Sequence, residues 1–349
     1  MTLESFIRAM PKVELHVHLE GSTRPETLLK LARRHGVTLP ADTVEGLRKW
    51  YEFRDFDHFI DVYIIISHCL RTADDIELIA REFLEGQAAQ NIIHSEVTYT
   101  PYSQYAKHRI SWKDQLAAVN RAREWAAREY GISMTLTVDI ARNESTEDGL
   151  ITAEWAIEGM GQGVTAFGLG GPEVGNPPEK HKPAFDRARA AGLPSAPHAG
   201  ETVGPESVWG ALRSLGAVRI GHGVRSIEDP ALMNELRERQ IPLEVCPTSN
   251  VCLKVVPSLA EHPLPKLLDA GLYITINSDD PPMFNTTLTD EWLAIAKTFG
   301  YEIEMIEKLS FNAVRAARLP EREKWELERR FGEEWRRAKR EHLLPPPDF

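Results

Sequence analysis

Short runs rich in β-branched and other apolar residues recur along the 349-residue chain, with helical patterns between them. The runs are 12–17, 92–99, 134–140, 163–169, 193–198, 217–222, 241–246 and 272–277. Strands that alternate with helices are parallel, because each crossover is helical, and eight such units are typical of a (β/α)8 TIM barrel. An open doubly wound sheet is the alternative, but it would need a Gly-rich phosphate-binding loop after the first strand, and the sequence has none there.

The spacing between the first two runs is irregular. They lie about 75 residues apart, whereas a helical crossover needs only about a dozen. Within this stretch, segment 54–70 carries apolar residues, among them Phe59 and Tyr63, at helical spacing. We expect one domain spanning 1–349, with inserted helices at about 38–85 lying as a lid over the barrel mouth. A helix packed against the side of the barrel is the alternative.

Composition narrows the possible partners. The formal net charge of −11 argues against a phosphate-backbone partner, so we expect no nucleic acid. The N-terminal segment is too short and too charged for a signal peptide, and the sequence has no run of 18 apolar residues, so we expect no membrane partner. Cys69, Cys246 and Cys252 form no CxxC pair, which suits a reducing compartment. These features predict a cytoplasmic protein that acts on a small molecule.

Polar or Gly-rich sequence follows nearly every predicted strand. The strand ends read "HVHLEG", "EVTYTPY", "DIARNE", "GLGGPE", "PHAGE", "IGHG", "CPTSN" and "NSDDP". Active sites of TIM barrels lie at the C-terminal face, where the strands end. The pattern therefore predicts an active site at that face.

Four of these strand-end residues suit a metal ion. His16 and His18 are two residues apart on a strand, so both side chains point into the barrel lumen. His198 closes the fifth run and Asp279 follows the eighth. Three imidazoles and one carboxylate with an open position are typical of a hydrolytic Zn²⁺ site, although a lone histidine is more often a satisfied core residue. We expect one Zn²⁺ per chain, because segment 163–173 has no lysine to bridge a second metal.

Three further residues are candidates for the chemistry. Glu201 lies three residues beyond His198, where the chain leaves the strand, and is a candidate general acid. His222 would orient the water as a base. Asp280 would bind substrate while Asp279 binds the metal, because adjacent carboxylates repel each other. Capping of a loop is the alternative role for Glu201.

The motifs "HVHLEG", "HAGE", "IGHG" and "NSDDP", in this order, resemble the adenosine deaminase family of the amidohydrolase superfamily, and the resemblance covers nearly the whole chain. It implies one Zn²⁺, hydrolytic replacement of the 6-amino group of a purine, and release of ammonia. The residues that match the family's zinc ligands are His16, His18, His198 and Asp279. The cytidine deaminase type of site is excluded, because its P-C-x-x-C motif is absent.

The resemblance also implies roles around the purine. Glu201 matches the residue that protonates N1, His222 the one that orients the hydroxide, and Asp280 the one that holds N7. In the family a backbone amide of a Gly-Asp-Glu motif contacts the purine, and here that motif begins at Gly171 and has Pro172 in place of the acidic residue.

Two features bear on the substrate. Glu20 stands where adenosine deaminases mostly carry an Asp that meets the ribose 5′-hydroxyl, and Glu is also seen there in relatives that deaminate adenine. Pro172 and its surroundings resemble the bacterial branch that deaminates aminodeoxyfutalosine in menaquinone synthesis. With Phe59 and Tyr63 as an aromatic wall, we expect an adenine nucleoside as substrate, either adenosine or one with a modified 5′ group such as aminodeoxyfutalosine.

Other functions stay open at this point. Adenine deaminase is one alternative. A metal-dependent phosphoesterase on the same barrel is another, but it would need further metal ligands or a cationic phosphate clamp. A binding module without catalysis would have lost a metal ligand or Glu201, and none is lost.

Overall fold

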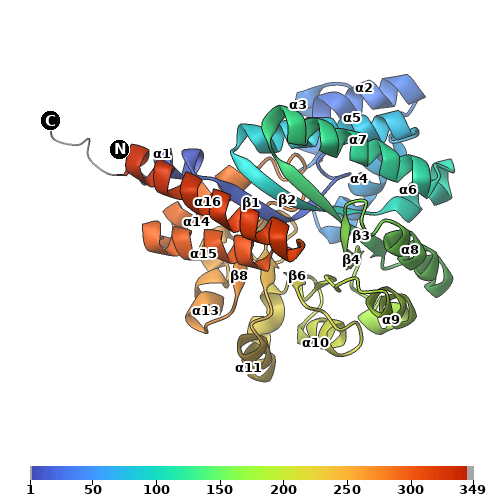
Figure 1. The fold of residues 1–349 in the computed structure, drawn as a ribbon. Helices are drawn as coiled ribbons and strands as arrows, with labels where there is room; N and C mark the ends of the chain where they lie inside the picture. The colour runs from blue at the N-terminus through green and yellow to red at the C-terminus, as the bar shows by residue number, and fades with distance from the viewer. Residues whose placement is uncertain (1, 344–349) are drawn as a thin grey trace.

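Eight parallel strands form the centre of the molecule, and the computed structural model describes residues 2–343 (Figure 1). They form two four-stranded sheets with the orders β1-β2-β3-β4 and β5-β6-β7-β8. The strands are β1 (Lys12–His18), β2 (Ile92–Tyr99), β3 (Ser133–Ala141), β4 (Val164–Gly170), β5 (His198–Ala199), β6 (Ile220–His222), β7 (Leu243–Val245) and β8 (Ile274–Ile276).

Backbone hydrogen bonds join the two sheets at both junctions. At one junction the N–H of His18 donates to the carbonyl of Asp279 over 2.9 Å, and the N–H of Asp279 donates to the carbonyl of His16 over 3.2 Å. At the other, Phe167 of β4 pairs with Ser195 just before β5. The strands therefore follow one another in chain order, which confirms the predicted (β/α)8 architecture.

The fifth strand is shorter than its sequence run. The run 193–198 becomes the two-residue strand β5, which begins only at His198. Pro194 and Pro197 have no backbone N–H to donate to a neighbouring strand, so regular pairing is interrupted there.

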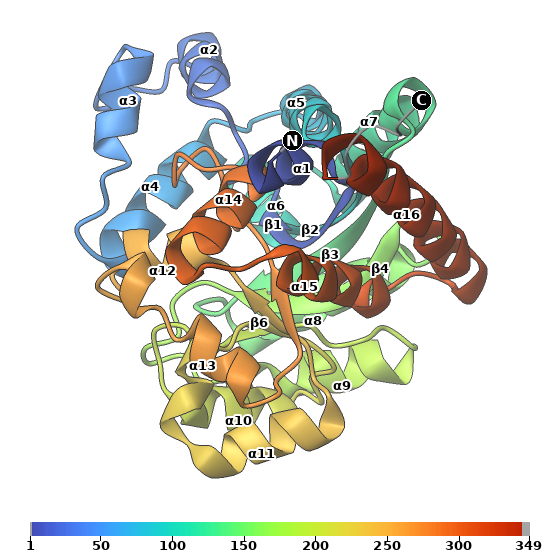
Figure 2. The same cartoon turned by 90° about the vertical axis from the view of Figure 1, so that its left-hand side faces the viewer.

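Helices surround the strands, as the end-on view in Figure 2 shows. The α-helices are α1 (Leu3–Ala9), α2 (Pro25–His35), α3 (Val44–Trp50), α4 (Phe56–His68), α5 (Ala73–Ala89), α6 (Pro101–His108), α7 (Trp112–Tyr130), α8 (Thr146–Glu158), α9 (Lys182–Ala190), α10 (Pro205–Arg213), α11 (Pro230–Arg239), α12 (Pro247–Cys252), α13 (Leu264–Asp269), α14 (Leu288–Phe299), α15 (Ile303–Ala316) and α16 (Glu321–His342). Three 3₁₀ turns are η1 (Pro178–His181), η2 (Val224–Glu228) and η3 (Leu259–Glu261). No helix in 2–343 is long and apolar enough to cross a membrane.

The long stretch between β1 and β2 holds α2 to α5. Helix α4 begins at Phe56 because the Asp55 side chain accepts the backbone N–H of His58 over 2.8 Å and so caps the helix. One face of α4 lines the cavity described below. Helix α5 packs along α7 and β2 at the side of the strands. Helix α4 therefore lines the cavity, whereas α5 packs at the side of the strands.

Candidate active site

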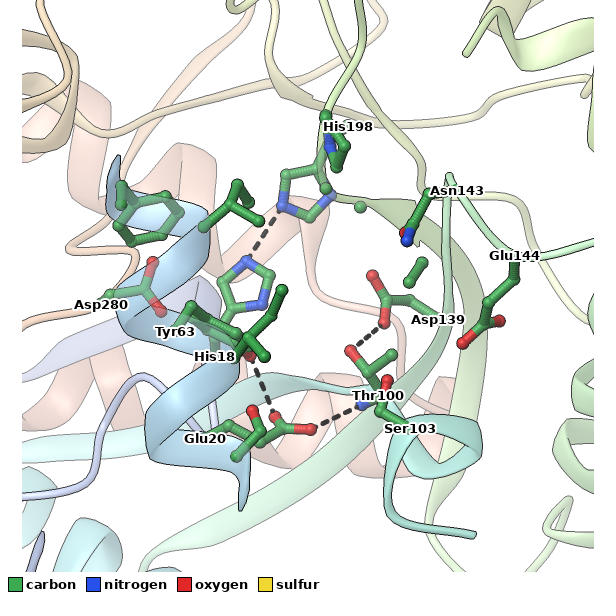
Figure 3. Close-up of a pocket in the computed structure, with 18 of the residues that line it drawn as sticks. His18, Glu20, Tyr63, Thr100, Ser103, Asp139, Asn143, Glu144, His198 and Asp280 are labelled. Carbon is green, nitrogen blue, oxygen red and sulfur yellow. Dashed lines mark hydrogen bonds between the residues drawn. The ribbon is translucent and has the colours of Figure 1, made fainter. Parts of the chain in front are cut away.

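A cavity of about 540 Å³ opens where the strands end, between the barrel and helices α4 and α6 (Figure 3). Most of the residues singled out from the sequence line it, namely His18, Glu20, Phe59, Tyr63, Gly171, His198, Glu201, His222, Asp279 and Asp280. His16 lies two residues earlier on β1 and does not line the cavity. The volume falls in the range of small-molecule sites.

The four residues expected to bind metal meet at one point. Their ligand atoms lie within 4.8 Å of one another, and all four side chains are buried. The Nε2 atoms of His18 and His198 are 3.0 Å apart (Figure 3). One carboxylate oxygen of Asp279 lies 3.4 Å from Nε2 of His16 and 3.4 Å from Nε2 of His18. The structure therefore gathers three nitrogen atoms and one oxygen atom around one position.

This donor set fits a divalent cation. Nε2 of His16 is buried and has no hydrogen-bond partner among the described residues. Burial lowers the pKa of His18 to about 4, and it lowers the pKa of His198 well below its usual value, so both rings are neutral and offer lone pairs. A metal ion would satisfy these nitrogen atoms at once, which no side chain of the cluster can do.

The rings are held with Nε2 toward the cluster. Nδ1 of His198 donates to the carbonyl oxygen of Leu169 over 2.9 Å. Nδ1 of His16 lies 2.9 Å from the Glu244 carboxylate, which is itself paired with the buried Arg219. Hydrogen bonds at Nδ1 leave the Nε2 lone pairs directed at the metal position, which is the usual outer-shell support of a metal-binding histidine.

Two residues of the site have an unusual backbone. Asp279 has φ 67° and His222 has φ 60°, in the left-handed region that non-glycine residues rarely adopt. The turn at Asp279 lets the adjacent carboxylates of Asp279 and Asp280 take different places. Such strain is concentrated at functional sites.

Two motif glycines leave room for functional side chains. A Cβ at Gly21 would stand 1.6 Å from Oδ1 of Asp280. A Cβ at Gly221 would stand 2.7 Å from Cε1 of His16. The glycines of "HLEG" and "IGHG" are therefore required by close packing against site residues.

Glu201 and Asp280 are both buried beside the metal position. Burial, followed by the charge of Asp279, raises the pKa of each carboxyl well above its usual value. Nε2 of His222 lies 3.7 Å from the Glu201 carboxylate and 3.9 Å from that of Asp279. Two buried carboxyl groups with raised pKa values are thus available to a substrate.

The loop that carries Glu201 is organised by Glu173, which is a role that the sequence did not reveal. The Glu173 carboxylate accepts the backbone N–H groups of Gly200, Glu201, Thr202 and Val203 over 2.8, 3.0, 2.7 and 2.9 Å. The pKa of Glu173 is lowered, because the nearby Arg142 charge and these hydrogen bonds outweigh burial.

The structure adds a second group of polar residues to the cavity. The backbone N–H of Thr100 donates to Glu20 over 3.1 Å, and its hydroxyl donates to Asp139 over 2.6 Å (Figure 3). The Tyr63 hydroxyl donates to the other oxygen of Glu20 over 3.3 Å. Thr100 and Asp139 were not singled out from the sequence, although both belong to the polar segments that we noted at the ends of the predicted strands. We call Glu20, Thr100 and Asp139 the hydroxyl cradle.

The two aromatic residues expected to form a wall, Phe59 and Tyr63, lie on α4 and line the cavity. Phe59 lines the cavity and packs against Phe53 and Phe284, with ring centroids 5.4 and 5.6 Å apart. The Tyr63 ring lies 6.2 Å from the ring of His18. Cys246 lies near His222 and Asp279, but burial raises the pKa of its thiol, which makes it a poor metal ligand.

Comparison with known proteins identifies the class. A family model described as adenosine deaminase matches residues 11–333. The chain belongs to the adenosine deaminase family, and it is a hydrolase that acts on carbon–nitrogen bonds in cyclic amidines. This membership favours the deaminase over the phosphoesterase alternative.

Individual relatives are similar to this chain in sequence or structure over most of their length. An aminodeoxyfutalosine deaminase of Streptomyces coelicolor is 43% identical over 90% of this chain and 82% of its own. The crystal structure of an adenine deaminase from Arthrobacter aurescens is 34% identical, with a TM-score of 0.88 over 93% of this chain and 99% of that one. An amidohydrolase from Burkholderia ambifaria, solved with bound Zn, is 28% identical, with a TM-score of 0.89 over 97% and 94% of the two chains.

Proposed function

We propose that this enzyme is a zinc-dependent deaminase that replaces the 6-amino group of an adenine nucleoside by oxygen and releases ammonia. The observation that carries the proposal is the cluster of His16, His18, His198 and Asp279 beside the buried carboxyl of Glu201, whose pKa is raised. The relatives named as purine deaminases, and the related structure solved with bound Zn, support it.

The chemistry divides among a few groups. His16, His18, His198 and Asp279 would hold the zinc ion, which would lower the pKa of a bound water toward neutrality and so supply the nucleophile for purine C6. Glu201, held protonated by burial, gives its proton to N1 and so prepares C6 for addition. Asp280, protonated for the same reason, donates a hydrogen bond to N7. The backbone amide of Gly171 contacts the purine ring, and His222 orients the water.

The hydroxyl cradle supports a nucleoside over a free base. Glu20 and Asp139 are almost fully buried, and their two negative charges repel each other. Burial and this repulsion raise the pKa of Glu20 to about 7. Thr100 fills only part of their hydrogen-bonding capacity. Hydroxyl groups of a ribose would donate to both carboxylates and relieve the unfavourable pair.

The outer wall supports an extension at the 5′ position. Apolar side chains of α4, among them Phe56, Ile60 and Ile64, line the cavity together with Phe59. A ring buried against such a wall gains roughly 1.5–3 kcal/mol, which favours a bulky 5′ group over a hydroxyl. Aminodeoxyfutalosine, the substrate named for a relative at 43% identity, is therefore the preferred candidate.

Adenine is the second candidate substrate. It is favoured by the similarity to an adenine deaminase structure and by Glu20, a residue that the family resemblance also associates with adenine as substrate. A free base would leave the hydroxyl cradle without a partner, which is why we place it second.

Ammonia release by the purified zinc-loaded protein tests these alternatives. The panel is adenine, adenosine, methylthioadenosine and aminodeoxyfutalosine. We expect the highest kcat/KM for a nucleoside with a bulky 5′ group and little activity on adenine. A tenfold preference for adenine or adenosine over the extended nucleosides would overturn the substrate proposal, and no release of ammonia from any purine would overturn the reaction.

A further inference from the structure

A chain of buried side chains leads away from Nδ1 of His222. Nδ2 of Asn250 lies 3.4 Å from Nδ1 of His222, and Oδ1 of Asn250 lies 3.1 Å from Nε2 of His262. The backbone N–H of Leu264 completes the chain by donating to Nδ1 of His262 over 3.0 Å. His222, Asn250 and His262 are at most 3% exposed.

The last donor of this hydrogen-bond chain determines which group donates in each of its hydrogen bonds. A backbone N–H can only donate, so Nδ1 of His262 is the acceptor from Leu264 and carries no proton. The proton of the neutral His262 ring is therefore on Nε2, which donates to Oδ1 of Asn250. The opposite orientation of the Asn250 amide would need both nitrogen atoms of His262 to be acceptors, and a neutral imidazole cannot provide that.

The same logic continues to His222. With Oδ1 of Asn250 facing His262, the amide presents Nδ2–H to Nδ1 of His222, which must accept. A neutral His222 then carries its proton on Nε2, and that atom lies between the carboxylates of Glu201 and Asp279. If His222 were protonated on both nitrogen atoms, its Nδ1–H would face Nδ2–H of Asn250, and two donors cannot form a hydrogen bond.

We infer that Asn250 and His262 are positioning residues, which hold His222 as the tautomer protonated on Nε2, so that it donates a hydrogen bond into the site. The tautomer follows from the hydrogen-bond chain alone, and only the group that receives the hydrogen bond rests on the proposed function. On that function, Nε2–H holds the oxygen of the attacking water, and Nε2 cannot take a proton from it. This role differs from the base expected from the sequence.

The fold supports a positioning role. Asn250 lies in α12 directly after β7, and its carbonyl accepts the N–H of Val256 over 3.1 Å, so its backbone is fixed from both sides. His262 lies between η3 and α13. Burying polar groups is costly unless each finds its partner, so a complete chain of three residues that ends at the site restricts each proton to one position.

Ring ¹⁵N NMR of histidine-labelled protein tests the inference independently of activity. The His222 signals are assigned by their loss in His222→Asn. We expect an unprotonated Nδ1 and a protonated Nε2 in the wild-type protein. Asn250→Asp replaces the donor by an acceptor, so the proton of His222 should move to Nδ1, and kcat should fall by roughly 10–100-fold with KM little changed. Asn234→Asp on the exposed face of α11 is the matched control and should change neither the signals nor kcat.

A second pair of variants keeps the test decisive if Asn250→Asp does not fold. His262→Gln retains a side-chain N–H donor toward Asn250 and should keep the His222 tautomer, whereas His262→Leu removes the donor and should mix the two tautomers. Wild-type His222 protonated on Nδ1, or an unchanged tautomer in folded Asn250→Asp, would overturn the inference. Loss of all deaminase activity with the expected tautomer would instead count against the proposed function.

Discussion

The backbone N–H of Glu201 donates to the carboxylate of Glu173 over 3.0 Å, so a buried carboxylate beyond β4 holds the loop that carries the proposed proton donor beyond β5. Three neighbouring N–H groups donate to the same carboxylate. The position of Glu201 therefore depends on a charge that never needs to touch the substrate.

Replacing Glu173 should separate positioning from chemistry. In Glu173→Gln the four N–H groups lose their charged acceptor, which costs roughly 1.5–3 kcal/mol per lost charged hydrogen bond and lets the loop move. We expect kcat to fall at least tenfold and the unfolding midpoint in urea to decrease. Glu179→Gln, at an exposed position of the neighbouring turn, should leave both unchanged. Wild-type kcat in Glu173→Gln would show that the loop is held by other contacts.

Glu201→Gln should remove the proton while retaining the shape. We expect kcat to decrease by roughly 10²–10⁴-fold with metal content unchanged. Because burial raises the pKa of Glu201, the acid form is present below that raised pKa and is lost as the pH rises through it. The wild-type enzyme should therefore lose kcat on the alkaline side, and the residual activity of the variant should lack this dependence. Activity within a factor of a few would assign the proton to another group.

Asp139→Asn should distinguish nucleosides from the free base. The change weakens acceptance of ribose hydroxyls but does not touch the proposed purine contacts, so kcat/KM for adenosine and its 5′ derivatives should fall by roughly 10–100-fold. The low activity on adenine should stay the same, and it is the internal control. Equal losses on adenine and adenosine would show that Asp139 acts through the metal cluster, since its carboxylate and the His198 ring both lie close to Gly170.

Gly21→Ala should displace Asp280. The new methyl group would overlap Oδ1 of Asp280, which has no room to move without leaving its place at the site. We expect at least a tenfold loss of kcat/KM with metal still bound. Gly86→Ala in α5 is the matched control, because its Cβ would meet only Arg24 Nη2 at 3.4 Å and alanine is favoured in a helix by roughly 0.5–1 kcal/mol. An active Gly21→Ala enzyme would argue against a role for Asp280.

The barrel could be predicted from sequence because it depends on local patterns. Each β-branched run ends on polar residues. Parallel strands bring those ends together on one face of the barrel, whatever the conformation of the loops. The two histidines of β1 share a face for the same reason. The shortness of β5 was also implicit in Pro194 and Pro197, which interrupt pairing in its run.

The remaining features depend on residues that meet only through the fold. Thr100 joins Glu20 to Asp139 because β1, β2 and β3 are neighbours, and neither spacing nor residue type indicates which strand-end carboxylates will share a hydroxyl. The same holds for His262, which reaches His222 through Asn250 from a loop forty positions along the chain.

Metal titration tests the central claim most directly. The protein is stripped with a chelator, and deamination of the best nucleoside is measured as zinc is added back, with bound zinc quantified in parallel. We predict no activity without metal, full recovery at one zinc per chain, and neither binding nor recovery in the His16→Ala, His18→Ala double variant. Full activity of the stripped protein, a requirement for two zinc ions per chain, or zinc retention in the double variant would contradict the account.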